Sequence, residues 1–132
     1  MNRRRIHVNL LFAALLLIMP AVHAELIELK WRSGTFMHKA SVAPKKFLEV
    51  CGKLKKGESI NWHYTADMPA DFNIHYHVGK DVVYPEKRLA SAIAEGTLVA
   101  PLEQDFCWMW VNKNEQAIEL DVQMKQAAAA SN

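Results

Sequence analysis

Apolar and polar residues alternate along two segments near the ends of the chain, over residues 27–32 and 118–124. Because successive side chains of a strand point to opposite faces, this period of two predicts strands with one buried face. Further short strands are expected between turn signals rich in Gly, Pro and Asn, at residues 35–42, 47–51, 59–65, 72–78, 81–84, 97–100 and 105–111. The chain is therefore predicted to be all-β, an antiparallel, jelly-roll-like β-sandwich of about seven to nine short strands.

Two segments depart from this alternation. Between Pro85 and Gly96, residues 87–95 carry several alanines, a leucine and an isoleucine, which predict one or two turns of helix. The tail over residues 126–132 contains four alanines and is expected to be flexible. The folded domain is accordingly expected to span residues 25–125.

The N-terminal segment is organised like a secretory signal. Three arginines at positions 3–5 precede an apolar run over residues 10–19, and Val22, His23 and Ala24 follow at the positions that a signal peptidase reads. This run is much shorter than the roughly 20 residues that cross a bilayer, which disfavours the alternative of an uncleaved anchor. We therefore predict cleavage after Ala24 and a periplasmic protein, with an extracellular location as the alternative.

The charge of the chain limits the classes of partner. Sixteen Lys and Arg face fourteen Asp and Glu, and three of the arginines leave with the predicted signal, so the remaining net charge is −1. A nearly neutral domain lacks the basic surface that attracts nucleic acid or an anionic membrane. The lysines at positions 53, 55 and 56 stand beside Gly57 and are interpreted as a solvated turn. Nucleic acid is thus excluded as a partner, and no membrane span is expected after cleavage.

Both cysteines, Cys51 and Cys107, lie in the predicted mature domain. An even number of cysteines in an oxidising compartment favours a disulfide. Two free buried thiols and a thiolate metal site are the alternatives. Thioredoxin-like redox chemistry has no support, because the sequence contains no Cys-x-x-Cys motif.

Two histidines give the sharpest chemical hypothesis. His75 and His77 are two residues apart in a predicted strand, so they project from one face about 6.5–7 Å apart. Two imidazoles at this spacing can reach one metal ion, because each nitrogen–metal bond is about 2 Å long. The alternative is that both are solvated polar residues on the outer face of a sheet.

His63 is the third candidate ligand. If residues 59–65 and 72–78 pair with numbers that sum to 138, His63 stands opposite His75, whereas a sum of 137 places it opposite an isoleucine. Met109 or His38 is a further candidate ligand, and softer ligands favour copper over zinc. A small copper- or zinc-binding protein is therefore the alternative function.

Two tryptophans suggest a different surface. Trp108 and Trp110 share one face of a predicted strand, and Cys107 and Met109 share the other. If the cysteines and Met109 fill the core, the tryptophans form an exposed apolar patch that binds a partner by stacking. If the tryptophans fill the core, this patch does not exist.

The sequence predicts an exported binding module that recognises a protein or another component of the cell envelope, and not an enzyme. It contains no nucleophile-elbow motif, and no carboxylate stands at a diagnostic spacing from the histidines. The loops over residues 67–71 and 79–84 are expected to contribute to the binding surface. The candidate ligand-binding residues are Trp108, Trp110, Asn73 and Tyr84.

The order of motifs in the central part of the chain resembles the GOLD (Golgi dynamics) domain, the lumenal β-sandwich of early-secretory-pathway cargo receptors. The motifs are Cys51 at the end of a strand, a Lys/Gly turn, an aromatic strand, Asp71-Phe72-Asn73-Ile74-His75, the Gly79 turn, Gly96-Thr97-Leu98, and Phe106-Cys107-Trp108 before Asn112. The resemblance covers roughly residues 42–124.

This resemblance implies a non-enzymatic domain with a disulfide between Cys51 and Cys107. It also implies binding of proteins, or of glycans or lipid-linked cargo. The receptors of this family continue into a coiled coil and a membrane span, which this sequence lacks, so we expect an exported bacterial relative that consists of the domain alone. The His75-Tyr76-His77 segment and the paired tryptophans are not part of the receptor pattern and suggest a site specific to this branch.

Overall fold

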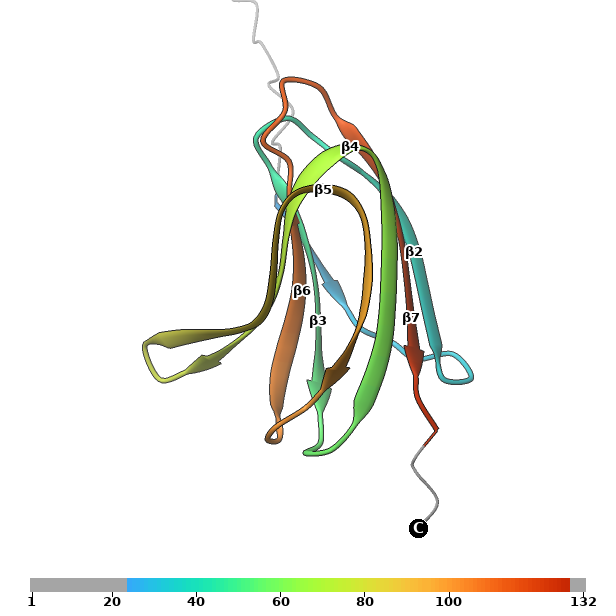
Figure 1. Cartoon of the computed structure of the whole chain (residues 1–132), viewed down its shortest axis with the longest axis vertical. Coiled ribbons are helices and arrows are strands. Elements are labelled where there is room, and N and C mark those ends of the chain that lie inside the picture. Colours follow the sequence, from blue (N-terminus) through green and yellow to red (C-terminus); the bar gives the residue numbers. More distant parts are fainter. Residues whose placement is uncertain (1–23, 129–132) are drawn as a thin grey trace, which may run out of the picture.

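The computed structural model describes residues 24–128, which form one curled, all-β sheet (Figure 1). Its strands are β1 (Glu25–Glu28), β2 (Thr35–Val42), β3 (Phe47–Leu54), β4 (Ser59–Val78), β5 (Asp81–Val99), β6 (Gln104–Val111) and β7 (Ile118–Gln126). The strand order is β1-β3-β6-β4-β7-β2, and β5 pairs with β4. The predicted all-β class is confirmed. All pairs are antiparallel except β1 with β3, which is parallel.

The described residues include no helix that is long and apolar enough to cross a membrane. The predicted signal segment lies outside the described residues, apart from Ala24.

The curl of the sheet comes from β4, which is one bent strand of 20 residues. Its first half pairs with β7 and its second half with β6. The two halves face each other, because the ring centroid of Phe72 lies 4.8 Å from that of Trp62 and 5.0 Å from that of Tyr64. At the bend, the Glu119 N–H donates to the Asp67 carboxylate at 2.8 Å. The result is a sandwich-like arrangement around one core.

This bend corrects one sequence-based expectation. Residues 59–65 and 72–78 were expected to be separate strands, and the three-histidine hypothesis required them to pair with each other. They are instead successive parts of β4, and Pro69 lies at a register shift between them. A proline is tolerated at such an irregularity, where the missing N–H breaks no regular ladder bond.

The tryptophans belong to the core, so the predicted exposed patch at Trp108 and Trp110 is wrong. Trp108 is 0% exposed and Trp110 is 1% exposed. The ring centroid of Trp110 lies 5.4 Å from that of Phe72 and 5.7 Å from that of Tyr64. Burying the large indole rings removes more apolar area from water than burying Met109 would, so β6 turns its aromatic face inward.

The predicted helix over residues 87–95 is also wrong, because this segment belongs to β5. Alanine and leucine are good helix formers, but intrinsic propensity is a small energy per residue, and the hydrogen-bonding partner offered by β4 overrides it. The strand carries a register shift where the Ala90 N–H donates to the Asp71 carboxylate at 2.9 Å. Ala90 has a φ of 47° there, an uncommon conformation for a residue other than glycine.

The C-terminal strand extends further than the sequence indicates. β7 ends at Gln126, and the Ala127 N–H donates to the Ser59 carbonyl at 2.8 Å. The first two residues of the predicted tail are therefore hydrogen-bonded to the sheet, and the flexibility of the tail stays a prediction. Residues 129–132 lie outside the described part of the chain.

Asn112 ties the end of β6 to the turn after β2. Its side chain is 0% exposed, and its amide donates to the Val42 carbonyl at 2.9 Å and to the Gln116 carbonyl at 2.8 Å. The Asn114 N–H donates to the Asn112 side-chain oxygen at 2.9 Å. Because these bonds satisfy backbone groups that would otherwise lack partners, this asparagine has a structural role.

Candidate functional site: a projecting hairpin and the polar cluster at its base

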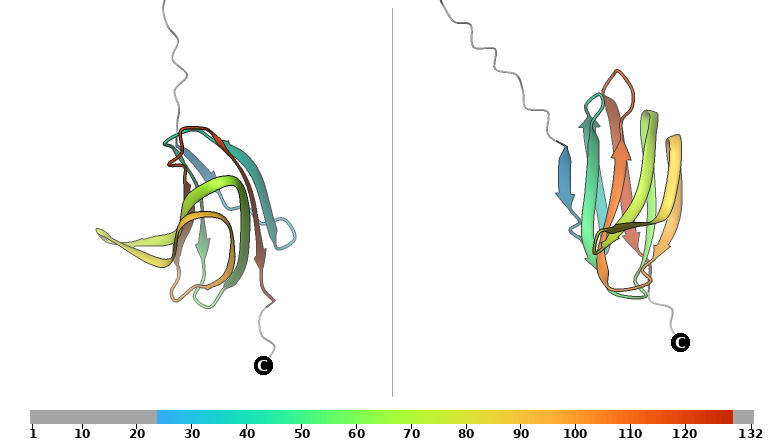
Figure 2. Two further views of the ribbon diagram at one scale, coloured as in Figure 1. Left: turned by 45° about the horizontal axis from the view of Figure 1, so that its top comes forward. Right: turned by 90° about the vertical axis from the view of Figure 1, so that its left-hand side faces the viewer.

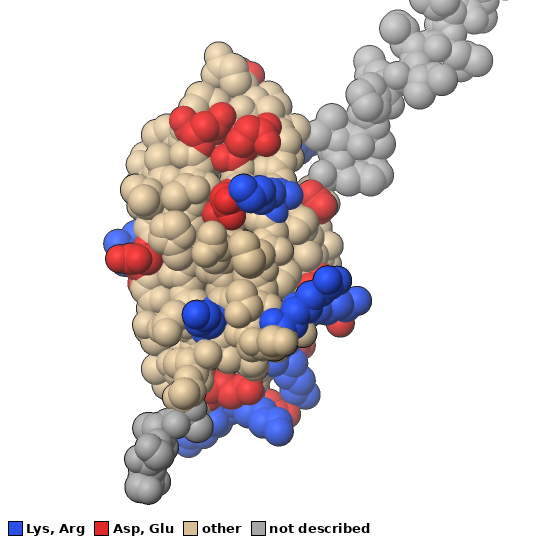
Figure 3. Space-filling model, turned by 90° about the vertical axis from the view of Figure 1, so that its right-hand side faces the viewer, with Lys and Arg blue, Asp and Glu red and all other residues tan. Residues whose placement is uncertain are grey.

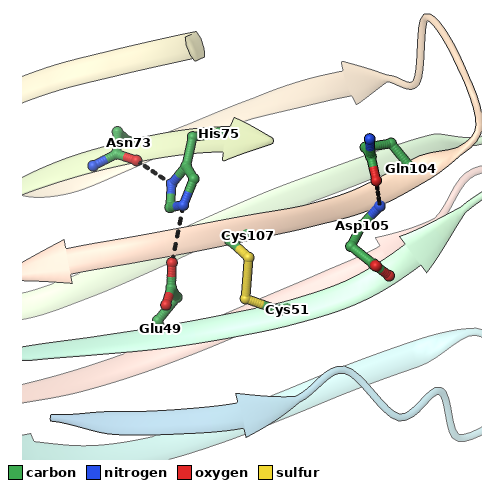
Figure 4. The surroundings of a disulfide bond; sticks show 7 residues. All are labelled: Glu49, Cys51, Asn73, His75, Gln104, Asp105 and Cys107. Carbon is green, nitrogen blue, oxygen red and sulfur yellow. Dashed lines mark hydrogen bonds and ion pairs between the residues drawn. A yellow bond between two sulfur atoms is a disulfide. The ribbon is translucent and has the colours of Figure 1, made fainter. Parts of the chain in front are cut away.

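A disulfide marks the centre of the outer sheet face formed by β3, β6 and the second half of β4. Cys51 and Cys107 stand directly opposite each other on β3 and β6 and are bonded to each other, which confirms the predicted disulfide (Figure 4). The next residue across the sheet from Cys107 is His75 of β4. The disulfide therefore links β3 to β6, and the polar side chains of this face lie next to it.

His75 lies at the centre of a polar cluster on this face (Figure 4). It is 6% exposed; its Nε2 lies 3.0 Å from a Glu49 carboxylate oxygen, and its Nδ1 lies 2.8 Å from the Asn73 side-chain oxygen. Burial lowers the pKa of His75, and the Glu49 carboxylate opposes that effect. A neutral ring donates one hydrogen bond, whereas the protonated ring donates to both neighbours.

The lowered pKa of His75 predicts a stability that depends on pH. The unfolded chain protonates His75 more readily than the folded chain does. The contribution of neutral His75 to the free energy of unfolding is therefore fully present above pH 6.5, the ordinary pKa of histidine. This contribution is lost as the pH falls from 6.5 through the lower pKa of His75 in the folded state. We expect the free energy of unfolding, measured in urea between pH 7.5 and 5, to fall less steeply for His75→Gln than for the wild type.

The exposed neighbour His77 supplies the control for this measurement. His77→Gln should retain the wild-type loss of stability on acidification. An unchanged pH dependence in His75→Gln would contradict the assignment to His75.

Beyond His75, the β4–β5 hairpin leaves the sheet and projects outward (Figures 1 and 2). We call residues 76–86 the arm. Its tip is a two-residue turn in which Gly79 has a φ of 59°, as type II′ turns require at their first central position. At its base, Tyr84 and Pro85 together stand opposite His75, because β5 carries an extra residue there. Such a bulge bends a strand pair and re-aims the residues beyond it.

The arm presents an apolar surface to solvent. Its exposed large hydrophobic side chains are Val78, Val82, Val83 and Tyr84. The Tyr84 ring centroid lies 5.8 Å from that of His75, and the Lys87 ammonium lies 3.8 Å from the Tyr84 ring centroid. A cation over a ring face is attracted to it, by about 0.5–1 kcal/mol at exposed sites. The arm therefore combines an exposed apolar end with a base fixed to the polar cluster.

The structure brings together some of the predicted site residues. Asn73, His75 and His77 share one face, as predicted, and the rings of the two histidines are 5.3 Å apart. Tyr84 reaches the same cluster from β5. Met109 lies on β6 between Glu49 and Asn73, directly opposite each in the register, and is half-buried.

Other predicted ligands lie elsewhere. His63 is in the first half of β4, where it pairs with Glu95 and Gln123 and not with His75. His38 lies on β2, opposite Val122. The expected three-histidine arrangement is therefore not formed.

The geometry does not support the metal alternative. In residues 24–128, the group that places three ligand atoms within reach of one ion is Glu49, Cys51 and Cys107, and both of its sulfur atoms are bonded to each other. Both ring nitrogens of His75 already have partners at hydrogen-bonding distance. A metal ion would have to displace these partners.

Sequence reasoning missed the part played by Glu49 and Lys87. Glu49 is the only charged residue in the predicted strand 47–51, and this is the feature of the sequence that could have indicated a polar neighbour. Lys87 lies in the segment that is predicted to be helical, and nothing in the sequence indicates that its ammonium lies over the Tyr84 ring.

The outer face of the other half of the sheet differs in character. It has a shallow hollow of about 490 Å³ lined mainly by polar side chains, including Asn61, His63, Glu95 and Gln123. On the side of the molecule drawn in Figure 3, side chains of both charge signs are interspersed with uncharged surface. This side has no continuous basic patch for a nucleic acid.

No protein-family model matches the chain, and no curated protein matches its sequence. Many solved structures share its fold, among them the following three. The PliG protein of Aeromonas hydrophila, a periplasmic lysozyme inhibitor of g-type lysozyme, has a TM-score of 0.59 at 10% identity, covering 78% of this chain and 96% of that one. The PliG protein of Salmonella Typhimurium, also a periplasmic inhibitor of g-type lysozyme, has a TM-score of 0.57 at 12% identity, covering 80% and 100%.

The third structure is the pre-peptidase C-terminal domain of a collagenase from Bacillus anthracis. It has a TM-score of 0.57 at 10% identity, covering 78% of this chain and 95% of that one. At such low identities these similarities show a common fold. The relation to the GOLD family stays a prediction.

Proposed function

We propose that this chain is an exported, non-catalytic protein-binding module and that its arm contacts the partner. The observation that carries the proposal is the exposed apolar end of the arm, formed by Val78, Val82 and Val83 outside the body of the sheet. Exposed apolar surface that is grouped on one element is typical of protein-interaction sites. Polar residues around it, among them Lys80 and Asp81, supply the rim that such interfaces usually have.

The base of the arm favours tight binding because it is held in place before the partner arrives. Tyr84 has both the His75 ring and the Lys87 ammonium as neighbours. A surface that is already ordered loses little conformational entropy on binding. Tyrosine is also enriched among residues that dominate interface energies. Tyr84 is therefore the proposed anchor, and the valines are the apolar contact.

A g-type lysozyme is the partner that we propose to test first. The same fold serves as a periplasmic inhibitor of g-type lysozyme in the two PliG proteins. The disulfide between Cys51 and Cys107 fits an oxidising compartment such as the periplasm. Both points support an exported protein that meets an enzyme outside the cytoplasm.

The test is a calorimetric titration of the protein with a g-type lysozyme. The double variant Val82→Ser/Val83→Ser removes two exposed methyl-bearing side chains and should weaken binding by about tenfold or more. Leu26→Ser is the matched control, because Leu26 is also an exposed apolar residue but lies on β1. Binding of the double variant with wild-type affinity would contradict the role of the arm. A wild-type protein that does not bind would contradict the choice of partner.

A further inference from the structure

The outer edge of β5 is not paired with another strand. Within residues 24–128, the only strand with which it pairs is β4, and its second half lies at the outside of the molecule, as the yellow strand at the right of Figure 2 shows. Six of the ten exposed large hydrophobic side chains in this part of the chain belong to β5. An exposed apolar edge of this kind is a template for pairing with another strand.

The regular part of this edge is residues 93–99. Here β5 pairs with β4 without a register shift, from Ile93 opposite Thr65 to Val99 opposite Ser59. The Ala100 N–H donates to the Glu58 carbonyl on the β4 side. Because backbone groups alternate in direction along an antiparallel strand, residues 93, 95, 97 and 99 turn their N–H and C=O groups to the open edge. Of these groups, the Ile93 carbonyl accepts a hydrogen bond from the Ser91 hydroxyl at 2.8 Å, which a pairing strand would replace.

Residues 93–99 also lack the devices that normally block edge pairing. They contain no proline, lysine or arginine, which are the residues that protect exposed edges. The first half of β5 is protected by Pro85, Lys87 and two register shifts. The outer edge of β2 carries Lys39, which is ion-paired to Asp121 at 2.9 Å. Of the edges of β5 and β2, residues 93–99 are therefore the segment most suited to pairing.

The segment is complementary to a second copy of itself. Antiparallel pairing about a two-fold axis at Gly96 places Ile93 opposite Val99 of the second copy, and Glu95 opposite Thr97. Ile93 is 64% exposed and Val99 is 58% exposed, so the pairing covers apolar surface on both sides. Glu95 is the only charged residue in the segment, and in this register a threonine, not the second glutamate, stands directly opposite it.

We infer that two copies of this chain associate through residues 93–99 of β5 and form one continuous sheet across a two-fold axis. Such an interface is isologous, since each copy offers the same patch to the other. The arm lies at the opposite end of β5 and is not part of this contact. The dimer would therefore display two arms, and this inference does not depend on the identity of the arm's partner.

Sedimentation equilibrium of the mature, oxidised protein tests the inference. We expect twice the chain mass for the wild type and at least a tenfold weaker association for Ile93→Lys. Met37→Lys is the matched control, because Met37 is likewise 64% exposed and lies on the other long edge strand, β2. The control should leave the association unchanged. Thermal unfolding of both variants confirms that they fold.

Amide hydrogen exchange followed by NMR tests the register. The amides of residues 93, 95, 97 and 99 should become protected as the protein concentration rises, because dimerisation pairs their outward N–H groups. A wild-type protein that is monomeric throughout the millimolar range would overturn the inference. So would a dimer that Ile93→Lys leaves intact, or outward amides that exchange equally fast at all concentrations.

Discussion

Replacing both Cys51 and Cys107 by alanine is expected to lower the free energy of unfolding by about 4 kcal/mol. The bridge joins residues 56 positions apart in the sequence, so it removes a large amount of conformational freedom from the unfolded chain. In the fold it connects β3 and β6, neighbouring strands within the sheet. Chemical denaturation of the oxidised wild type and of the double alanine variant measures the difference.

Reduction supplies the control for this measurement. The reduced wild type should unfold at nearly the same denaturant concentration as the double alanine variant, because each has lost the same covalent constraint. A double variant as stable as the oxidised wild type would contradict a structural role for the bridge. A loss of about 4 kcal/mol is a large part of the 5–15 kcal/mol that typically stabilises a domain.

The second large effect is expected for Trp110→Ala, at about 3–5 kcal/mol. Trp110 is 1% exposed and packs against Tyr64 and Phe72 from the two halves of β4. Removing its indole leaves a cavity in the core between the two halves of β4. Thermal unfolding followed by circular dichroism detects this loss even if the variant is only partly folded at room temperature.

Trp31→Ala is the comparison for this variant, because Trp31 is only partly buried at the margin of the core. It should lose clearly less stability than Trp110→Ala. Trp110→Phe keeps an aromatic ring at the site and should lie between the two. Equal stability of Trp110→Ala and the wild type would show that this tryptophan is not a core residue.

The short strands could be predicted from the sequence because alternation is a local property. β2 has the predicted bounds, and the predicted strand 105–111 differs from β6 by one residue. The bend of β4 could not be predicted, because Met68 and Pro69 look the same in a bend as in a chain reversal. The bend depends on residues distant in the sequence, such as Asn114, whose amide donates to the Pro69 carbonyl at 2.8 Å.

Alternation also separates two faces of a strand without saying which one is inward. Trp108 and Met109 were correctly placed on opposite faces of one strand. Their burial is decided by the neighbouring strands, because Trp108 pairs with Val50 of β3 and Ile74 of β4, which are both buried. This long-range pairing is not visible in the segment itself.

In the candidate site, too, some residues could be placed from local alternation and others only from the long-range pairing of strands. A period of two was enough to place Asn73, His75 and His77 together. Glu49 and Tyr84 join them only through the strand order and the extra residue in β5. The arm was foreseen as a loop at residues 79–84, but its length and its bulged base follow from the pairing of β4 with β5.

The fold does not determine which partner is bound, because one fold serves different functions. The same architecture occurs in periplasmic inhibitors of g-type lysozyme and in a collagenase domain. A fold by itself therefore does not identify what is bound. The site must be tested directly on this chain.

The most direct test is a hydrogen–deuterium exchange footprint of the protein alone and with a saturating g-type lysozyme. The proposed function predicts slower exchange in the arm, over residues 76–86, and unchanged exchange in β2 and in the polar hollow around His63. Protection confined to that hollow, or no protection anywhere in the chain, would contradict the claim that the arm is the protein-binding surface.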